Sequence, residues 1–403
     1  MKARPECSLR RGLEFAQSLV VLTVWLVACS PAATTSPAMG VVWRARLDGA
    51  VDGTPAVSGL TVFAGSAGGE LAAWNLATGS TVWSDRDLGA ISDSPAVLGG
   101  RVYVGTLGGH VLAVAATDGS RLWDWTAPPH AAMWSSPVLY HDLVLIGVAS
   151  PYGDTPLVAG RLVALDPATG AERWNVCVVP GCPAGDGVWS TVAVDRAGVA
   201  FVGVGNPDDG VLAFDPLTGR HRWFRSLYRD QDRDLDVGAR PLILDSAGRE
   251  LVIEASVEGT LFALDAGTGD VVWSRRLVNG SAVHGLIASP ASDGVNVYVA
   301  SASAPDGLFA IAPANGSVVW RHETSGPVYS APAVRGGSIV FGVGAVFGDL
   351  GAGSVVELAT VDGRELSHFD SRSAVRAGPA VAGRYAVVGD YAGDLFALRL
   401  SSS

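Results

Sequence analysis

Lysine is almost absent from this chain of 403 residues, since Lys2 is the only one. Basic side chains total 28 against 39 acidic ones, which gives a formal net charge of −11. This balance argues against nucleic acid as a partner, because nucleic-acid binding needs clustered positive charge. The sequence also lacks the G-x-S-x-G, H-E-x-x-H, P-loop and C-x-x-C-H patterns. It therefore gives no sign of a serine hydrolase, a zinc protease, a nucleotide hydrolase or a c-type haem protein.

No apolar run is long enough for a membrane-spanning helix, although the mean hydropathy is +0.31. Leu19–Ala28 is a ten-residue apolar segment after a basic start, as in a signal peptide. Its end, Leu26-Val27-Ala28-Cys29, resembles the bacterial lipoprotein box. This resemblance predicts a signal peptide at 1–28, a lipidated Cys29, a flexible tether at 29–40 and an extracytoplasmic address in the cell envelope. Cleavage by an ordinary signal peptidase is the alternative.

Cysteines are few, and only two lie beyond the predicted lipidation site. Cys177 and Cys182 occur close together in V-C-V-V-P-G-C. No second Cys or His pair accompanies them, so their spacing does not indicate a zinc site. In an oxidising compartment they are expected to form a local disulfide.

Helical periodicity is also missing, and a repeat takes its place. Arg161–Trp174 reads as a short apolar strand, an Asp- and Gly-containing turn, and a return strand that ends in tryptophan. Near-copies place an aromatic residue every 40 to 51 residues, at Trp43, Trp83, Trp123, Trp174, Trp223, Trp273, Trp320 and Phe369. A period of this length, with four strands in each unit, is typical of the blades of a β-propeller.

The repeat predicts an all-β fold at 41–403 with eight four-stranded antiparallel blades. The final unit, Val375–Leu400, has three strand patterns, whereas Val41–Arg44 precedes any complete unit. We therefore expect the N-terminal strand to complete the last blade, which removes an open sheet edge. A seven-bladed ring with a stray segment is the alternative.

The repeated A-x-D-x-x-T-G-x-x-x-W pattern resembles the tryptophan-docking motif of the pyrroloquinoline-quinone (PQQ) β-propellers. The resemblance covers residues 41–400 and implies the fold rather than one function. That family includes quinoprotein alcohol dehydrogenases, among them polyvinyl-alcohol-dehydrogenase-like proteins. It also includes the propeller lipoprotein of the outer-membrane barrel-assembly machinery, which is a scaffold without quinone.

One position in each blade is expected to face the central channel. It lies three residues before the proline, or before Val192 in its place, that starts each inner strand. These positions are Asp52, Ser92, Trp134, Trp189, Gly238, Ile287, Tyr329 and Arg376. A planar ligand could stack on Trp134 or Trp189 while Arg376 and Asp52 bind its polar edge. The alternative is that these side chains plug the channel.

Three segments match the dehydrogenase branch of the family. Trp189 lies in a G-x-x-V-W-S segment, Asn206 matches a Ca²⁺-ligating asparagine, and Asp236 ends a D-x-D run that carries the catalytic aspartate. The resemblance therefore implies Asp236 as general base and Asn206 and Asp234 as metal ligands, with Ca²⁺ polarising the quinone carbonyl.

Three features depart from that branch. Thr155 stands near the expected ligating glutamate, with Asp154 the only acid nearby, and Val257 replaces the expected quinone-binding base. The adjacent cysteine pair that stacks on the cofactor is absent. We therefore predict a monomeric, lipid-anchored binding or scaffolding module that needs no cofactor, with a Ca²⁺- and PQQ-dependent dehydrogenase as the alternative.

The partner is expected over blades three to five, where the connecting segments 141–159, 176–187 and 228–237 are longest. An envelope protein and a small ligand at the aromatic mouth both remain open.

Overall fold

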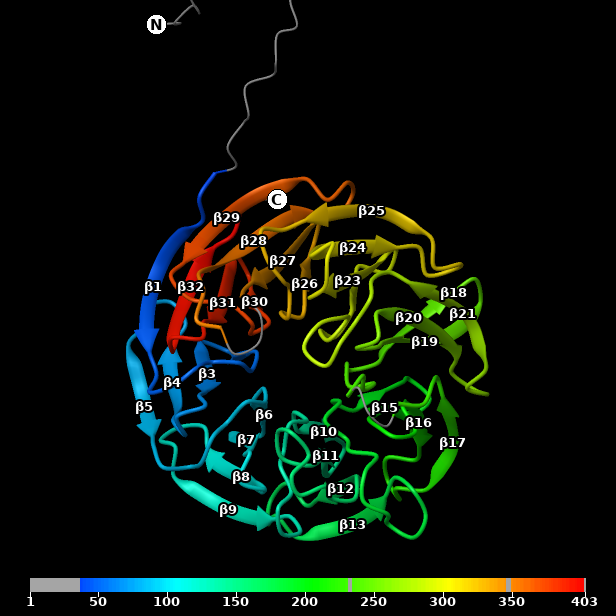
Figure 1. The fold of residues 1–403 in the computed structure, drawn as a ribbon. Helices are drawn as coiled ribbons and strands as arrows, with labels where there is room; N and C mark the ends of the chain where they lie inside the picture. Colours follow the sequence, from blue (N-terminus) through cyan, green and yellow to red (C-terminus); the bar gives the residue numbers. More distant parts are fainter. Residues whose placement is uncertain (1–36, 231–233, 346–348, 402–403) are drawn as a thin grey trace, which may run out of the picture. The chain divides into compact units, whose positions relative to one another are not determined.

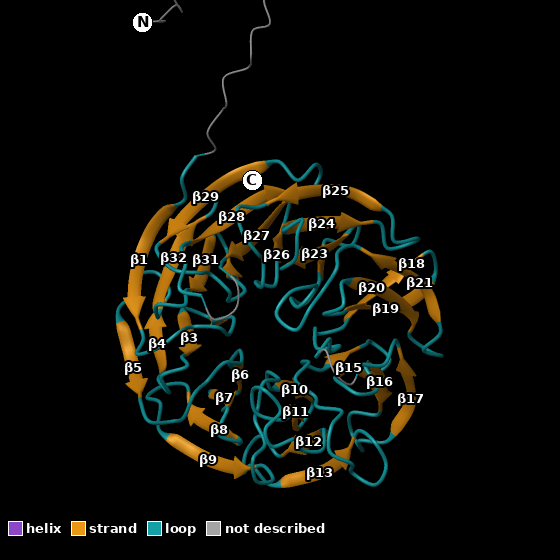
Figure 2. Ribbon diagram, in the orientation of Figure 1, coloured by secondary structure: helices purple, strands orange, loops and turns teal. Residues whose placement is uncertain are grey.

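The computed structural model describes residues 37–230, 234–345 and 349–401, and these form a ring of β-sheets around a central axis (Figure 1). The described residues contain strands and loops but no helix (Figure 2). Accordingly, they contain no helix long and apolar enough to cross a membrane. The prediction of an all-β propeller with eight four-stranded antiparallel blades is confirmed.

Each blade runs from a short inner strand at the axis to an outer strand at the rim, in chain order. The first four blades are β2 (Ala56–Ser58), β3 (Thr61–Gly65), β4 (Leu71–Asn75) and β5 (Thr81–Asp85); β6 (Ala96–Leu98), β7 (Arg101–Gly105), β8 (His110–Ala115) and β9 (Arg121–Thr126); β10 (Val138–Tyr140), β11 (Leu143–Val148), β12 (Arg161–Leu165) and β13 (Glu172–Cys177); β14 (Ala193–Val194), β15 (Ala200–Val204), β16 (Gly210–Phe214) and β17 (His221–Ser226).

The other four blades follow the same order, except that the eighth takes a strand from the other end of the chain. They are β18 (Leu242–Ser246), β19 (Arg249–Ala255), β20 (Thr260–Asp265) and β21 (Val271–Arg276); β22 (Ala291–Ser292), β23 (Val297–Ser301), β24 (Gly307–Ile311) and β25 (Val318–Glu323); β26 (Ala333–Arg335), β27 (Ser338–Val343), β28 (Gly353–Ala359) and β29 (Glu365–Ser371); β30 (Ala380–Ala382), β31 (Tyr385–Gly389), β32 (Asp394–Arg399) and β1 (Gly40–Arg46).

The tryptophan repeat holds neighbouring blades together. The Trp123 indole of blade two donates from Nε1 to the Pro167 carbonyl of blade three at 3.0 Å. A Cβ at Gly170 would lie 2.7 Å from the Trp123 ring, and the φ of Gly170 is +72°. Only glycine allows both this approach and this backbone conformation. The same tryptophan–glycine contact recurs at six further blade junctions, where the glycines are Gly79, Gly119, Gly219, Gly269, Gly316 and Gly363.

The aspartate of the repeat shapes the turn that carries this glycine. Asp166 Oδ1 accepts the backbone N–H groups of Ala168 and Thr169, both at 2.9 Å. Its carboxylate also pairs with the Arg173 guanidinium. The Arg173 guanidinium, followed by these hydrogen bonds, lowers the pKa of Asp166 to about 2. The D-x-x-T-G sequence is therefore explained by turn geometry and blade packing rather than by chemistry at a site.

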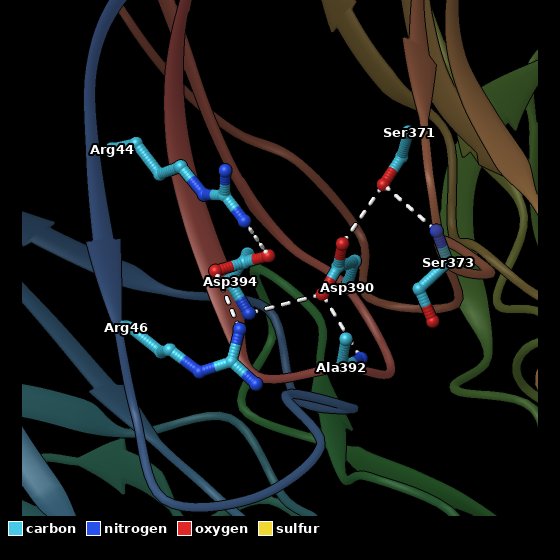
Figure 3. Close-up of polar contacts among 7 residues, drawn as sticks. All are labelled: Arg44, Arg46, Ser371, Ser373, Asp390, Ala392 and Asp394. Atoms are coloured by element: carbon cyan, nitrogen blue, oxygen red, sulfur yellow. Dashed lines mark hydrogen bonds and ion pairs between the residues drawn. The ribbon is translucent and has the colours of Figure 1, made fainter.

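The eighth blade joins the two ends of the described chain. β1 pairs antiparallel with β32, with Gly40 opposite Arg399 and Arg46 opposite Asp394. The guanidinium groups of Arg44 and Arg46 both reach the Asp394 carboxylate (Figure 3). These contacts come from segments about 350 residues apart in sequence.

Asp390 anchors the turn next to this junction. Its Oδ1 accepts the backbone N–H groups of Ala392 and Asp394 at 3.0 Å, and its Oδ2 accepts the Ser371 hydroxyl at 2.8 Å (Figure 3). Ser371 ends β29, so the carboxylate links blades seven and eight. Burial raises the pKa of Asp390, which is consistent with its position in the interior of the junction.

Candidate ligand-binding site

A cavity of about 500 Å³ opens at one mouth of the central channel, and we call it the funnel. Its walls are the loops that enter the inner strands and the loops that follow the second strands. Seven of the eight predicted channel positions line it: Asp52, Ser92, Trp134, Trp189, Ile287, Tyr329 and Arg376. Their side chains thus surround a cavity. Its size is within the range of small-molecule sites.

Trp189 is held by Asp236, which the sequence predicted to belong to the same site. Its Nε1 donates to Asp236 Oδ2 at 2.7 Å, and Asp236 Oδ1 accepts the Asn206 backbone N–H at 2.8 Å. The indole lies against Gly238, where an added Cβ would approach Trp189 Cζ2 to 1.8 Å. The remaining channel position, Gly238, therefore lies behind Trp189 and does not line the funnel.

Trp134 occupies the neighbouring part of the wall. Its Nε1 donates to the Ser150 carbonyl at 3.0 Å, and the Ser150 hydroxyl accepts the Val158 backbone N–H at 3.0 Å. Ser150 and Val158 belong to the long segment 141–159, whose Tyr152 and Leu157 also line the funnel. The length of this segment predicted a binding role. In the structure, the segment holds the Trp134 indole in place and extends the funnel wall.

Arg376 lies on a part of the funnel wall formed by two tyrosines. Its guanidinium is 4.2 Å from the Tyr391 ring centroid and 5.7 Å from that of Tyr329. Nη2 donates to the Asp349 carbonyl at 3.3 Å. The positive charge also acts on Asp52, whose pKa is raised by burial and lowered by Arg376. Tyr391 was not anticipated from the sequence, because it lies outside the repeated channel position.

The acidic groups of the funnel influence one another. Burial, followed by the charges of Asp234 and Asp154, raises the pKa of Asp236 to about 6 against the opposing hydrogen bonds from Asn206 and Trp189. Partial burial likewise raises the pKa of Asp234, together with the charges of Asp154 and Asp230. Asp154, Asp234 and Asp236 all line the funnel. The funnel therefore has a strongly acidic side.

Two buried carboxyl groups behind this wall were missed by sequence reasoning. Asp209 Oδ2 accepts the Asp230 backbone N–H at 2.9 Å, and the Asp209 side chain is fully buried. Burial, followed by the charges of Asp236, Asp230 and Asp186, raises the pKa of Asp209 to about 8. Burial, followed by the charge of Asp208, raises the pKa of Asp186 to about 6. No sequence signal marks these two residues, because aspartate is also common in exposed turns.

Asp209 should make the stability of this wall dependent on pH. Its folded-state pKa lies above that of an unfolded aspartate, so folding favours the protonated form and stability falls as pH rises towards and through 8. We expect the free energy of unfolding to be greater at pH 6 than at pH 9, with a slope of at most about 1.4 kcal/mol per pH unit for this one proton.

Urea denaturation across this pH range measures the effect, with Asp209→Asn as the matched variant. Asparagine retains an acceptor for the Asp230 N–H and tolerates the φ of +34° at this position. The variant should have a flatter pH dependence than the parent. An equal slope in both proteins would show that Asp209 does not titrate in this range.

The residues of the funnel can be compared with those that would be needed to hold Ca²⁺ and a quinone. Both oxygens of Asp236 are engaged, one by Asn206 and one by Trp189. Among the described residues, no three His, Cys, Asp or Glu side chains gather at metal-binding distance. Val257 lines the funnel where the resemblance implies a basic residue. We therefore derive no reaction step through Ca²⁺ and the quinone.

The two remaining predictions concern cysteines. Cys177 and Cys182 form a disulfide with a Cα–Cα distance of 5.3 Å, as expected. It lies at the end of β13, within the long connection to blade four. The predicted lipidation site, Cys29, lies outside the described residues, as does the predicted signal peptide.

Eight four-stranded blades joined by tryptophan–glycine contacts define a propeller of the PQQ type. The chain belongs to the PQQ_2 family, described as outer membrane protein assembly factor BamB, whose model matches residues 33–204, 190–281 and 257–403.

Curated relatives are dehydrogenases. The chain is 24% identical over 269 residues to a polyvinylalcohol dehydrogenase from a Pseudomonas species, and 29% identical over 216 residues to one from a Sphingopyxis species. These matches cover 53% and 40% of this chain but only 42% and 33% of the relatives. The chain thus matches less than half the length of either enzyme.

Solved structures show the same fold in proteins with different names. A quinohemoprotein alcohol dehydrogenase from Comamonas testosteroni superposes with a TM-score of 0.76 at 17% identity, covering 91% of this chain and 78% of that one. BamB from Moraxella catarrhalis gives a TM-score of 0.68 at 19% identity, covering 90% and 100%. At these identities the likeness concerns the fold alone.

Proposed function

We propose that this protein is a lipid-anchored, extracytoplasmic binding module whose funnel takes a small ligand over blades three to five, without oxidising it. The observation that carries the proposal is the funnel itself. It is a cavity of about 500 Å³ in which both tryptophans are held by hydrogen bonds to their Nε1 atoms. A wall held in this way loses little side-chain entropy when a ligand binds.

The longest loops of this wall come from the elaborated part of the ring, and shorter loops of the other blades complete it. Segment 141–159 supplies Ser150, Tyr152 and Leu157, and the connection after blade four supplies Asp234 and Asp236. The first two blades contribute only short turns. Binding residues are often found on such loops, because the loops can vary in sequence while the rigid scaffold that positions them is kept. This distribution supports binding over blades three to five.

A quinoprotein dehydrogenase is the second candidate, and one observation favours it. Trp189, Asn206 and Asp236, which the resemblance assigns to the cofactor, the metal and proton transfer, lie together in the funnel. The curated relatives also carry dehydrogenase names. Against it stand Val257 and the engaged oxygens of Asp236. The two candidates predict different ligands for the same cavity.

The proposal is tested by native mass spectrometry of the tagged full-length protein extracted from its own membranes. We expect a bound small molecule that is lost in Trp189→Leu, whose circular dichroism should remain that of a folded propeller. In parallel, PQQ and Ca²⁺ added to the parent should give neither a quinone absorbance band nor dye-linked oxidation of alcohols. Turnover that depends on PQQ and Ca²⁺ would refute the proposal in favour of the second candidate.

The envelope address is a separate part of the proposal, with residues 1–28 as signal peptide, 29–40 as tether and 41–403 as propeller. We propose that a monomer is attached to the membrane through lipid on Cys29. Cys29→Ser should release the protein from the membrane fraction and abolish incorporation of labelled palmitate. Continued labelling of that variant would contradict the anchor.

A further inference from the structure

The charged side chains of the funnel are unequal in number. Among the residues that the structure describes, Asp52, Asp154, Asp234 and Asp236 line it together with one arginine, Arg376, which gives this set a formal charge of −3 when all are ionised. Carboxylates that line one cavity repel one another and are costly to ionise together. A cation placed among them would lower the cost, whereas an anion would increase it.

The positive charge of Arg376 is already engaged with groups of the protein. The Arg376 guanidinium faces the rings of Tyr391 and Tyr329 and donates to the Asp349 carbonyl. Burial raises the pKa of Asp52, and the positive charge of Arg376 opposes this shift. The arginine is also only 6% exposed, so it offers little surface to a ligand. Its arrangement is that of a structural cation within the wall.

The two tryptophans contribute apolar ring surface to the funnel wall. Their only polar atoms are occupied, by Asp236 in the case of Trp189 and by Ser150 in the case of Trp134. The face of an indole carries negative electrostatic potential and attracts a cation, most strongly where water is excluded. Apolar neighbours such as Leu107, Val257 and Ile287 complete the lining.

From this combination we propose that the ligand of the funnel is an organic cation, an alkylated ammonium group with an apolar body. This inference rests on the proposed function, since it names the chemistry that the same cavity selects. The ammonium group lies between the indole faces and the acidic side formed by Asp154, Asp234 and Asp236. The apolar body contacts the aliphatic lining.

The experiment compares three probes of nearly equal shape that differ in charge. They are choline, its neutral isostere 3,3-dimethylbutan-1-ol and the anion 3,3-dimethylbutanoate. Quenching of tryptophan fluorescence in the full-length protein measures each affinity. We expect choline to bind about tenfold more tightly than the neutral alcohol, in line with a cation–π contribution of about 1–2 kcal/mol, and the anion not to bind.

A double variant tests the acidic side without disturbing the fold. Asp154 and Asp234 are exposed, so Asp154→Asn with Asp234→Asn should leave stability unchanged. It should weaken choline binding at least threefold and leave the binding of the neutral alcohol as in the parent. Asp87→Asn is the matched control, because Asp87 is an exposed aspartate outside the funnel whose φ of +67° suits asparagine.

Different failures point to different errors. Equal affinity for choline and the neutral alcohol, or tighter binding of the anion, would overturn the inference and leave the funnel as a ligand site. Absence of binding by all three probes would count against both the inference and the proposed function.

Discussion

A protein that lacks β1 is expected to lose at least about 5 kcal/mol of stability and to aggregate. Trp43 of this strand is only 8% exposed, and its Nε1 donates to the Leu76 carbonyl of blade one at 2.7 Å. Removal of one buried tryptophan side chain costs about 3–5 kcal/mol, and the strand also contributes its hydrogen bonds to β32. Without it, β32 becomes an open edge that can pair with another molecule.

Deletion of 40–46 can be measured by urea denaturation and by light scattering after size-exclusion chromatography. The matched control is the double variant Arg44→Ala with Arg46→Ala, which keeps the strand and removes its ion pairs with Asp394 and the contact of Arg44 with the Phe396 ring. Those arginines are 51% and 65% exposed whereas Asp394 is 7% exposed, so the control should lose stability but less than the deletion. A monomeric deletion protein of unchanged stability would show that blade eight does not depend on β1.

Gly238→Ala is expected to abolish ligand binding in the funnel, with at least a tenfold loss of affinity. The new Cβ would approach Trp189 Cζ2 to 1.8 Å, so the indole has to move. Movement breaks the Nε1 bond to Asp236 and removes the ring face from the wall. Overpacking of this kind also costs about 1–3 kcal/mol of stability.

Gly337→Ala is the matched control for this substitution. A Cβ at Gly337 would meet nothing within 4 Å, and neither glycine has a positive φ. The control should bind ligand as the parent does and unfold at the same urea concentration. If Gly238→Ala also bound ligand with parental affinity, the position of Trp189 would not determine binding.

The fold could be predicted from the sequence because the repeat has a direct structural cause. At seven blade junctions the glycine of the turn receives the tryptophan of the preceding blade, as Gly170 receives Trp123, so the pattern recurs around the ring. The same regularity allowed the channel residues to be predicted, because equivalent positions of successive blades face the same central axis. Seven of them line the funnel.

The parts of the site that escaped prediction lie outside the repeat. Tyr391 follows the second strand of its blade and reaches Arg376 only because of loop conformation. Asp209 looks like any turn aspartate in sequence, and its burial depends on the loop that carries Asp230. Motif matching did bring Trp189, Asn206 and Asp236 together. It could not show that hydrogen bonds already occupy both Asp236 oxygens.

The origin of the last blade has a consequence for the order of folding. Met39 donates to the His368 carbonyl of β29, and the next residue begins the strand that pairs with β32. During synthesis this segment emerges first, yet its partners emerge last. It must stay extended and unpaired while seven blades form, and contacts so distant in sequence are slow to establish. A chain arrested before Leu395 should therefore be far more open to proteases than the finished protein.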